Sequence, residues 1–406
     1  MKRLLSMALR NVGRNRRRSL LTGLTVFFGV MVIVNARGLM WGLQSMLIED
    51  TVEARVGALQ VHRRGYVDSA DAAPLELSLP ADEPFRQRLL AIPNVAGASG
   101  RLVINGQASN GRAQTLFVGR GVDLAHELET CPRSAVTVKA GGSMLQPADA
   151  DAALLGSALA GAFGVGVGGS VALQATSPGG RVNSLDVQVK GLTESAFPFE
   201  NQRVAVLPLS TAQGLVGMAG RVTEYAVRVH ELSRLEETAD ALRAALGPDV
   251  EVHTWRDLQA FLRDVIYRQN TLLGGVSLLL FVVVLTGIIN TMSMSVFERT
   301  REIGMLLALG VRRRAILQLF LLEGVLIGLA GGLMGALAGR LLVGGVAALG
   351  ISFNISGIAA VTVLRPQVTP LFVAAAVAVA VSGSVLASLW PAWRASRLDP
   401  VQALRS

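Results

Sequence analysis

The sequence is poor in the residues on which disulfide-rich domains and metal sites depend. It contains one cysteine among 406 residues, which excludes a disulfide framework and a thiolate zinc site. Its four histidines do not occur in H-E-x-x-H or a similar ligand spacing, so we predict no metal site. No G-x-x-x-x-G-K-[ST] motif occurs, so these residues supply no P-loop for ATP hydrolysis, and we expect no enzyme activity from them.

Charge is also scarce. Charged residues make up 17% of the chain, against roughly 25% in a typical soluble domain, while 51% of the residues are hydrophobic. This balance excludes a disordered tail protein and argues against an ordinary cytosolic enzyme. The formal net charge is nevertheless +9, and nearly all basic residues are arginines. Such a basic excess is typical of nucleic-acid-binding proteins. It also occurs beside membrane spans, so the position of the charges decides between a nucleic-acid-binding protein and a membrane protein.

Four segments are apolar over the roughly 20 residues needed to cross a bilayer. We predict membrane helices at 19–41, 270–293, 315–340 and 370–391. The first segment has a signal peptide as its alternative. Its apolar stretch is long for a signal peptide, however, and no small-residue cleavage site follows it directly.

Arginines beside these segments predict the topology. Residues 1–18 contain seven basic and no acidic residues, residues 294–314 five basic and two acidic, and residues 392–406 three basic and one acidic. Because positive flanks stay in the cytoplasm, both termini and the 294–314 segment are predicted to be cytoplasmic, and the 341–369 loop extracytoplasmic. The basic excess is thus a topology signal of a multi-pass inner (plasma) membrane protein, and we expect no nucleic-acid partner.

The long segment 42–269 is predicted to be an extracytoplasmic α/β domain. It holds 20 basic and 25 acidic residues, so it lacks the positive bias of the flanks. Period-two alternation predicts strands at Leu185–Val189 and Tyr225–Val229. Ser233 with Glu236, and Thr254 with Asp257, are typical of capping boxes that open helices.

Breaks near residues 105 and 200 predict two subdomains, with about 105–200 inserted into the outer one. Gly-rich turns and short strands dominate between these points. Cys131 precedes a proline in a loop-like stretch of this segment, and we expect it to have no functional role. The overall prediction is an α-helical membrane protein with four transmembrane helices and a large α/β extracytoplasmic domain between helices 1 and 2.

The third predicted span carries glycines at four-residue spacing, which places each set on one helical face and lets another helix approach closely. Packing within the monomer and a dimer seam explain this pattern about equally well. The span also contains Glu323, about two turns inside its cytoplasmic end. We favour a structural ion pair with the arginine-rich loop, or a backbone contact, over a proton relay. The glycines are Gly324, Gly328 and Gly332 in one set and Gly331, Gly335 and Gly339 in the other.

The stretch F-E-R-T-R-E-I-G-M-L-L-A-L-G-V at 297–311 resembles the signature of FtsX/MacB-type ABC transporter permeases. Glu323-Gly324 fits the E-G element of the following span, and residues 391–405 resemble the family's closing P-A-x-R-A-x-x-x-D-P-x-x-A-L-R. The opening A-L-R-N at residues 8–11, followed by Arg18-Ser19, also fits. The order of one span, a large external domain and three spans matches as well, so the resemblance covers the whole chain.

The resemblance implies that residues 294–314 form a coupling helix that docks on a separate ABC ATPase subunit. Apolar side chains would insert into a groove of the ATPase while charged side chains make polar contacts. The alternative is a solvated loop held near lipid headgroups. The expected coupling residues are Glu298, Arg299, Arg301, Glu302, Ile303, Gly304, Leu306 and Leu307.

The resemblance further implies a dimer with a second copy or a paralogue. ATP and Mg²⁺ would bind to the partner ATPase, and this chain would bind no cofactor. MacB itself carries a fused nucleotide-binding domain, from which this chain departs. Energy would enter at the cytoplasmic loop, and mechanotransmission would deliver work outside the membrane.

Three kinds of external work fit this family. The first is release of lipoproteins or lipid-linked cargo, as in the LolC/LolE branch, which would involve a periplasmic carrier. The second is MacB-like efflux of peptides or small molecules through a periplasmic adaptor. The third is FtsX-like activation of a cell-wall hydrolase. For the first, an amphipathic extension of the first span would line a cavity open to membrane lipid, through Leu39, Leu43, Met46 and Leu47.

Overall fold

The computed structural model describes residues 2–14, 16–195, 198–350, 352–353 and 362–399. The chain divides into two compact units. We call Met1–Gln44, Val265–Ile351 and Leu364–Ser406 the membrane unit, and Ser45–Asp264 with Ser352–Val363 the external unit. Residues 400–406, which include the end of the predicted cytoplasmic tail and of the family's closing motif, lie outside the described residues.

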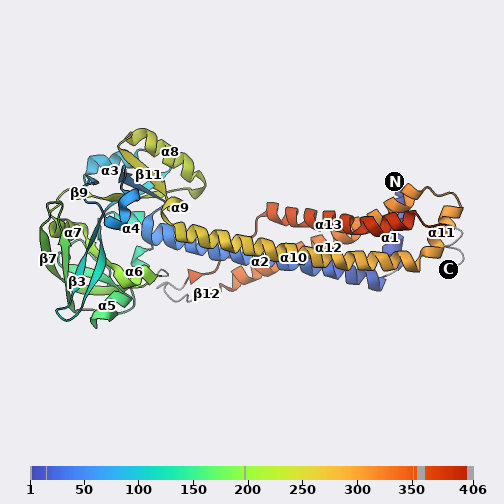
Figure 1. Cartoon of the computed structure of the whole chain (residues 1–406), viewed down its shortest axis with the longest axis horizontal. Coiled ribbons are helices and arrows are strands. Elements are labelled where there is room, and N and C mark those ends of the chain that lie inside the picture. Colours follow the sequence, from blue (N-terminus) through green and yellow to red (C-terminus); the bar gives the residue numbers. More distant parts are fainter. Residues whose placement is uncertain (1, 15, 196–197, 351, 354–361, 400–406) are drawn as a thin grey trace. The chain divides into compact units, whose positions relative to one another are not determined.

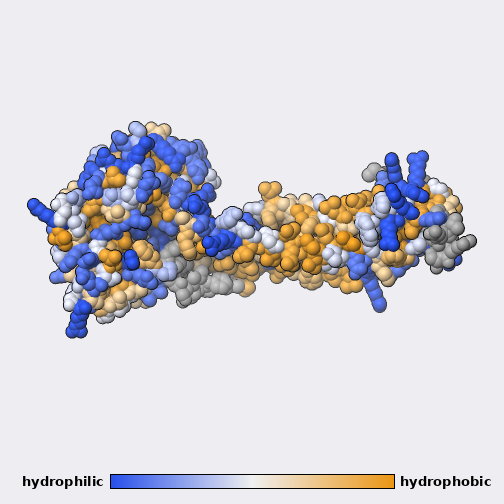
Figure 2. All heavy atoms as spheres, viewed as in Figure 1, coloured by the Kyte–Doolittle hydropathy of each residue, from blue (hydrophilic) through white to orange (hydrophobic). Residues whose placement is uncertain are grey.

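Within the described residues, four helices are long and apolar enough to cross a membrane, which agrees with the predicted number of spans. They are α2 (Arg16–Thr51), α10 (Ala260–Glu298), α12 (Arg313–Leu349) and α13 (Pro370–Ser396) (Figure 1). At 1.5 Å per residue, the 39 residues of α10 extend about 58 Å, nearly twice the thickness of a bilayer's hydrocarbon core. The predicted spans therefore correspond to the apolar parts of longer helices, along which hydrophobic side chains cover the visible surface (Figure 2).

The two glycine faces of α12 lie against two different helices of the same chain. A Cβ atom on Gly328 would lie 2.6 Å from Ser384 Oγ on α13, so only glycine permits this approach. On the other face, a Cβ atom on Gly331 would lie 2.7 Å from the carbonyl oxygen of Gly23 on α2. Packing within the monomer therefore accounts for both faces. The α13 side comprises Gly324, Gly328 and Gly332, and the α2 side comprises Gly331, Gly335 and Gly339.

Two shorter helices, α1 (Lys2–Arg14) and α11 (Thr300–Ala308), lie at one end of the membrane unit (Figure 1). There Ile303 of α11 joins a small apolar cluster with side chains of α10, α12 and α13. The helix is followed by Gly310, whose φ of +84° is a conformation that favours glycine. The other buried members of the cluster are Val296, Ile316, Phe320, Ala392 and Ala395.

The external unit is built on one nine-stranded sheet with the order β11-β1-β10-β3-β4-β8-β5-β7-β6. An additional antiparallel pairing joins β3 to β6, so the six strands β3, β4, β8, β5, β7 and β6 close a barrel-like ring of pairings. The strands are β1 (Leu59–Arg63), β3 (Val95–Ser109), β4 (Gln114–Val122), β5 (Ala152–Gly156), β6 (Ser170–Thr176), β7 (Val182–Thr193), β8 (Val204–Pro208), β10 (Glu224–Val229) and β11 (Val250–Thr254).

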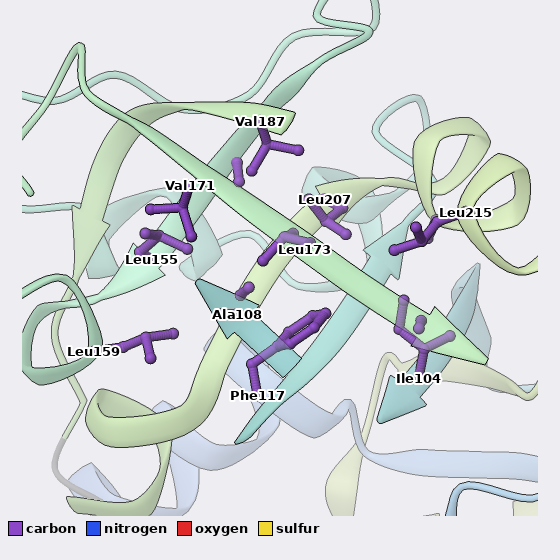
Figure 3. Close-up of a cluster of buried hydrophobic side chains, with 14 of the residues drawn as sticks. Ile104, Ala108, Phe117, Leu155, Leu159, Val171, Leu173, Val187, Leu207 and Leu215 are labelled. Atoms are coloured by element: carbon purple, nitrogen blue, oxygen red, sulfur yellow. The ribbon is translucent and has the colours of Figure 1, made fainter. Parts of the chain in front are cut away.

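The main apolar core of this unit lies inside the ring of strands. Phe117 of β4, Leu173 of β6 and Leu207 of β8 are buried together, as Figure 3 shows. The helices α5 (Ser157–Phe163) and α7 (Leu209–Val216) add further apolar side chains to the same cluster. Burial of this apolar surface is the main favourable contribution to folding of the unit.

Short elements complete the external unit. They are the helices α3 (Glu83–Leu90), α4 (Glu127–Thr130), α6 (Pro198–Arg203), α8 (Leu235–Leu246) and α9 (Trp255–Leu258), the π-helical turn η1 (Val52–Val56), the 3₁₀ turns η2 (Val67–Ala72), η3 (Ser134–Thr137) and η4 (Leu232–Arg234), and the short strands β2 (Leu79–Pro80), β9 (Arg221–Val222), β12 (Ser352–Phe353) and β13 (Thr362–Val363).

These elements test the local sequence predictions. Both predicted strands exist, within β7 and β10. β10 is an inner strand, between β1 and β3, and is largely buried. The capping box of Thr254 and Asp257 is confirmed. The one predicted at Ser233 is wrong, because the 3₁₀ turn η4 precedes α8, which begins at Leu235 without a side-chain cap.

The predicted insertion of about 105–200 remains a prediction. Strands β4 to β7, which arise from this segment, all belong to the barrel-like ring. However, β3 runs across the expected boundary at residue 105 and pairs with β10 as well as with β4. The two parts of the external unit thus share a continuous strand.

Candidate functional site

Residues 294–314, which we call the coupling segment after its predicted role, have an inward face and an outward face. Ile303 is 4% exposed, and Leu307 packs against the same apolar cluster. On the opposite side of α11, Met305 is half exposed and Leu309 is 82% exposed. Ile303 therefore packs in the interior of this chain, whereas Met305 and Leu309 are exposed. The insertion of Ile303, Leu306 and Leu307 into a partner's groove stays a prediction. Met305 and Leu309 are spaced i, i+4, and so are Ile303 and Leu307. The two pairs are offset by two residues, so the sequence alone indicates that they lie on opposite sides of a helix.

The remaining predicted coupling residues divide between these faces. Arg301 is exposed, and Leu306 is partly exposed. Gly304 and Arg299 are buried, so they act within the chain. Glu298 and Glu302 are partly exposed, but both form ion pairs with arginines from the start of the chain.

A chain of polar contacts ties the coupling segment to α1 and α12. Glu323 Oε1 accepts hydrogen bonds from Asn11 Nδ2 at 2.7 Å and from Arg299 Nη1 at 3.1 Å. Arg299 Nε donates to Glu302 Oε2 at 3.4 Å. Arg14 Nη2 donates to both carboxylate oxygens of Glu302, at 2.6 and 2.7 Å. The partner of Glu323 is thus Arg299, from the arginine-rich segment, and the network joins α1, α11 and α12.

The two ends of this network differ in their exposure to solvent. The side chains of Glu323 and Arg299 are 7% and 10% exposed, so their pair is largely desolvated. Glu302 lies in solvent at the first turn of α11, where a negative charge is favoured by the helix dipole. The hydrogen bonds from Arg14 hold the pKa of the Glu302 carboxyl below its usual value, against the opposing effect of partial burial.

Asn11 and Arg14 are network residues that the sequence prediction did not single out. They are separated from their partners by 312 and 288 positions. Helical spacing within one segment carries no information about such a contact. Arg18, which pairs with Glu298 at 2.8 Å, belongs to the same group of contacts from the start of the chain.

A cavity of about 380 Å³ lies within the membrane unit, between α2, α10 and α13. Its lining is almost wholly apolar and includes Val30, Phe281 and Val379. The residues predicted to line a cargo cavity lie further along α2. Leu39 is exposed, Leu43 and Leu47 are partly exposed, and Met46 is 4% exposed, so Met46 does not face an open cavity.

The external unit contains a buried ionic cluster around Arg101, whose side chain is 1% exposed. Its Nε donates to Glu127 Oε2 at 3.2 Å, and its Nη1 donates to the backbone carbonyl of Arg55 in η1. Cys131 Sγ lies 3.0 Å from Arg101 Nη2, and burial raises the pKa of this thiol to about 11. Within the described part of the chain, no three His, Cys, Asp or Glu residues are arranged to hold a metal ion.

Two family models match the chain in sequence order. A MacB-like periplasmic core domain matches residues 19–245, which is more than half of the chain, and an FtsX-like permease C-terminal domain matches residues 274–400. The residues of the network between α11 and α12 lie within the second match.

The curated relatives include LolC and MacB proteins. The lipoprotein-releasing system transmembrane protein LolC of Xylella fastidiosa (strain Temecula1) is 27% identical over 400 residues, covering 94% of this chain and 92% of LolC. The macrolide export ATP-binding/permease protein MacB of Syntrophobacter fumaroxidans is 36% identical over 180 residues, covering 44% of this chain and 23% of MacB. The MacB of Sodalis glossinidius is 26% identical and covers 99% of this chain and 60% of that protein.

The chain spans between about a quarter and a third of the length of several of the MacB relatives that it matches. Among solved structures, the extracellular domain of the noncanonic ABC-type transporter YknZ from Gram-positive bacteria aligns with 48% of this chain and 99% of that domain, at 13% identity and a TM-score of 0.35. On the two family models and the four membrane helices, this chain belongs to the FtsX/MacB family of ABC transporter permeases.

Proposed function

We propose that this permease couples ATP hydrolysis by a separate ATPase subunit to the release of lipoproteins or lipid-linked cargo from the inner membrane. The observation that carries the proposal is the match to LolC, which covers nearly all of both proteins. The MacB relatives, whose names include an ATP-binding function, extend well beyond the matched region. The present residues contain no P-loop motif, so ATP and Mg²⁺ would bind to the partner subunit.

The contacts of α11 suggest how energy would enter the permease. The ATPase would dock on the outward face of α11, through Met305 and Leu309. The Arg299–Glu323 ion pair would transfer the displacement of α11 to α12. Because α12 packs closely on α2 and α13 through its glycine faces, these helices would move together. A second permease copy or a paralogue would complete the dimer.

The arginine-rich ends of the membrane unit support a cytoplasmic location for both termini. The external unit would then lie in the periplasm and perform the work there. A substrate would not have to cross the bilayer, because motion alone is transmitted.

The apolar cavity between α2, α10 and α13 supports a lipid-linked cargo. Hydrocarbon chains of the cargo would move from membrane lipid onto an apolar protein surface. The free-energy cost would be small, because the chains would not be exposed to water. Leu39 and Leu43, further along α2, would extend this apolar surface toward the outer leaflet.

Photo-crosslinking in native membranes tests the proposal. A photoreactive phenylalanine analogue at Phe281, inside the cavity, or at Leu43 is expected to capture acylated proteins, which are lost on ATP turnover. The control position is Leu341, which is exposed on α12 and does not line the cavity. Adducts with lipid alone, equal at Phe281 and Leu341, would contradict a cargo site in this cavity.

Efflux through a periplasmic adaptor is the second candidate, because a MacB-like core domain matches more than half of the chain. An adaptor protein recovered with the intact permease, together with no acylated cargo at Phe281 or Leu43, would favour efflux over lipoprotein release.

A further inference from the structure

A second cavity, which we call the arginine groove, lies where α10, α11 and α13 meet at the end of the membrane unit. It has a volume of about 550 Å³. Phe297 and Trp390, which are 59% and 54% exposed, form part of its wall. Arg301 and Arg394 supply the positive charge, and Glu298 is the acidic residue of the lining.

The guanidinium of Arg394 lies over two aromatic rings. Its guanidinium carbon lies 5.3 Å from the ring centre of Phe297 on α10 and 5.7 Å from that of Trp390 on α13. Stacking of this kind leaves the N–H donors in the plane of the guanidinium free to bind an acceptor. Among the described residues, no carboxylate forms an ion pair with Arg394 or Arg301.

Three other arginines at this end of the unit pair with the nearby carboxylates. Arg14, Arg18 and Arg299 are paired with Glu302, Glu298 and Glu323, respectively. Glu298, the acidic lining residue of the groove, is thus already neutralised by Arg18. The groove therefore offers two unneutralised cations to a ligand.

The setting of the groove indicates which anion it receives. Trp390 stands at the end of the apolar run of α13, and tryptophan is enriched where a span meets the headgroup region. The anionic lipids of the cytoplasmic leaflet attract basic residues at this depth. A planar guanidinium can bind two oxygens of a phosphate at once. In a zwitterionic lipid, the cationic group of the headgroup partly neutralises the charge of that phosphate.

We propose that the arginine groove binds the phosphate of an anionic phospholipid headgroup, with Arg301 and Arg394 as the binding residues. The lipid would hold α10, α11 and α13 together at the point where the coupling segment begins. This site is separate from the apolar cavity and does not depend on the identity of the cargo.

Native mass spectrometry of the full chain in detergent tests this proposal. The probes are dioctanoyl phosphatidylglycerol, dioctanoyl phosphatidylcholine and inorganic phosphate. We expect the wild-type chain to bind phosphatidylglycerol about tenfold more tightly than phosphatidylcholine, in line with two cations near one phosphate. Arg301→Gln with Arg394→Gln is expected to abolish this preference, and Arg394→Lys alone to weaken it, because lysine keeps the charge without the planar stack.

Arg397→Gln is the matched control. Arg397 stacks on Trp393, with its guanidinium carbon 4.4 Å from the ring centre, at the same end of α13, but it does not line the groove. This variant is expected to keep the lipid preference, and unchanged thermal unfolding of each variant shows that it is folded.

Three outcomes would overturn the proposal. The first is equal binding of the two lipids to the wild-type chain, or a preference that survives in the double variant. The second is displacement of phosphatidylglycerol by the same concentration of inorganic phosphate, which would assign the groove to a soluble phosphate. The third is a wild-type chain without lipid preference, together with a double variant that no longer retains the partner ATPase in a pull-down. This result would assign the groove to the subunit interface.

Discussion

Arg299, at the start of the coupling helix, donates a hydrogen bond to Glu323 of a different helix, α12, with 3.1 Å between Nη1 and Oε1. Both side chains are largely buried, so each depends on the other for its charge balance. The pair links the segment expected to meet the ATPase to the helix whose two faces pack on α2 and α13. Its loss should affect both stability and coupling.

Glu323→Gln removes the negative charge and leaves Arg299 buried beside a neutral amide. We expect a loss of at most about 3 kcal/mol in the free energy of unfolding in detergent, because Arg299 keeps Glu302 as a second partner. Glu298→Gln, which breaks a more exposed pair, should cost less than about 1 kcal/mol. Adding Arg299→Gln to Glu323→Gln should recover part of the loss, and strictly additive effects would contradict a direct coupling between the two residues.

Gly335→Ala tests the close packing of α12 on α2. A Cβ atom at this position would collide with the backbone carbonyl of Phe27, so we expect a destabilisation of about 2 kcal/mol despite the better helix propensity of alanine. Gly344 is the control, because no atom lies within 4 Å of a Cβ atom there. Gly344→Ala should be neutral or stabilising by up to about 1 kcal/mol. Equal melting temperatures for the two variants would refute the packing argument.

Glu302 predicts a pH dependence of the contact between α1 and α11. The hydrogen bonds from Arg14 lower the pKa of this carboxyl in the folded chain. The pair therefore contributes fully above the unfolded-state pKa of about 4.3, and the contribution is lost as the pH falls through the lower folded-state pKa. Because Glu302 is partly exposed, we expect only a few tenths of a kcal/mol. The loss of thermal stability between pH 7 and a pH below 4 should be larger by this amount in the wild type than in Glu302→Gln, because the other carboxyls titrate in both chains.

The outward face of α11 should carry the contact with the ATPase. Met305→Ser with Leu309→Ser is expected to reduce recovery of the ATPase subunit in a pull-down by about tenfold, because exposed apolar anchors dominate such interfaces. Ala308→Ser, an exposed change on the same helix, should leave recovery unchanged. Full recovery with the double variant would place the docking surface elsewhere.

Cys131 should be chemically inert in the folded chain. Its thiol is fully buried and its pKa is raised to about 11 by burial, so almost no thiolate exists at pH 8. N-ethylmaleimide at pH 8 is expected to leave Cys131 unlabelled until the chain is denatured, as followed by mass spectrometry. Rapid labelling of the native chain would show that the external unit opens around the Arg101 cluster.

The spans and the motifs at 297–311 and 391–405 could be recognised in the sequence because their signals are local. A hydrophobic run, an arginine-rich flank or a four-residue glycine spacing is complete within one segment. The same holds for the capping box at Thr254 and Asp257. The prediction at Ser233 was wrong because a 3₁₀ turn displaces the start of the helix, and such a turn has no distinct sequence pattern.

The sequence by itself determined four membrane helices, an α/β domain between the first two, and a short amphipathic segment after the second. These follow from the cost of exposing apolar side chains to water and from the periodicity that hides them. Only the tertiary structure decided which side chains of that segment face inward, that Asn11, Arg14 and Arg299 meet the carboxylates of Glu302 and Glu323, and that β3 closes a ring with β6. The contacts of Asn11 and Arg14, and the pairing of β3 with β6, join residues far apart in the chain, where geometry and charge balance, not local pattern, select the partner.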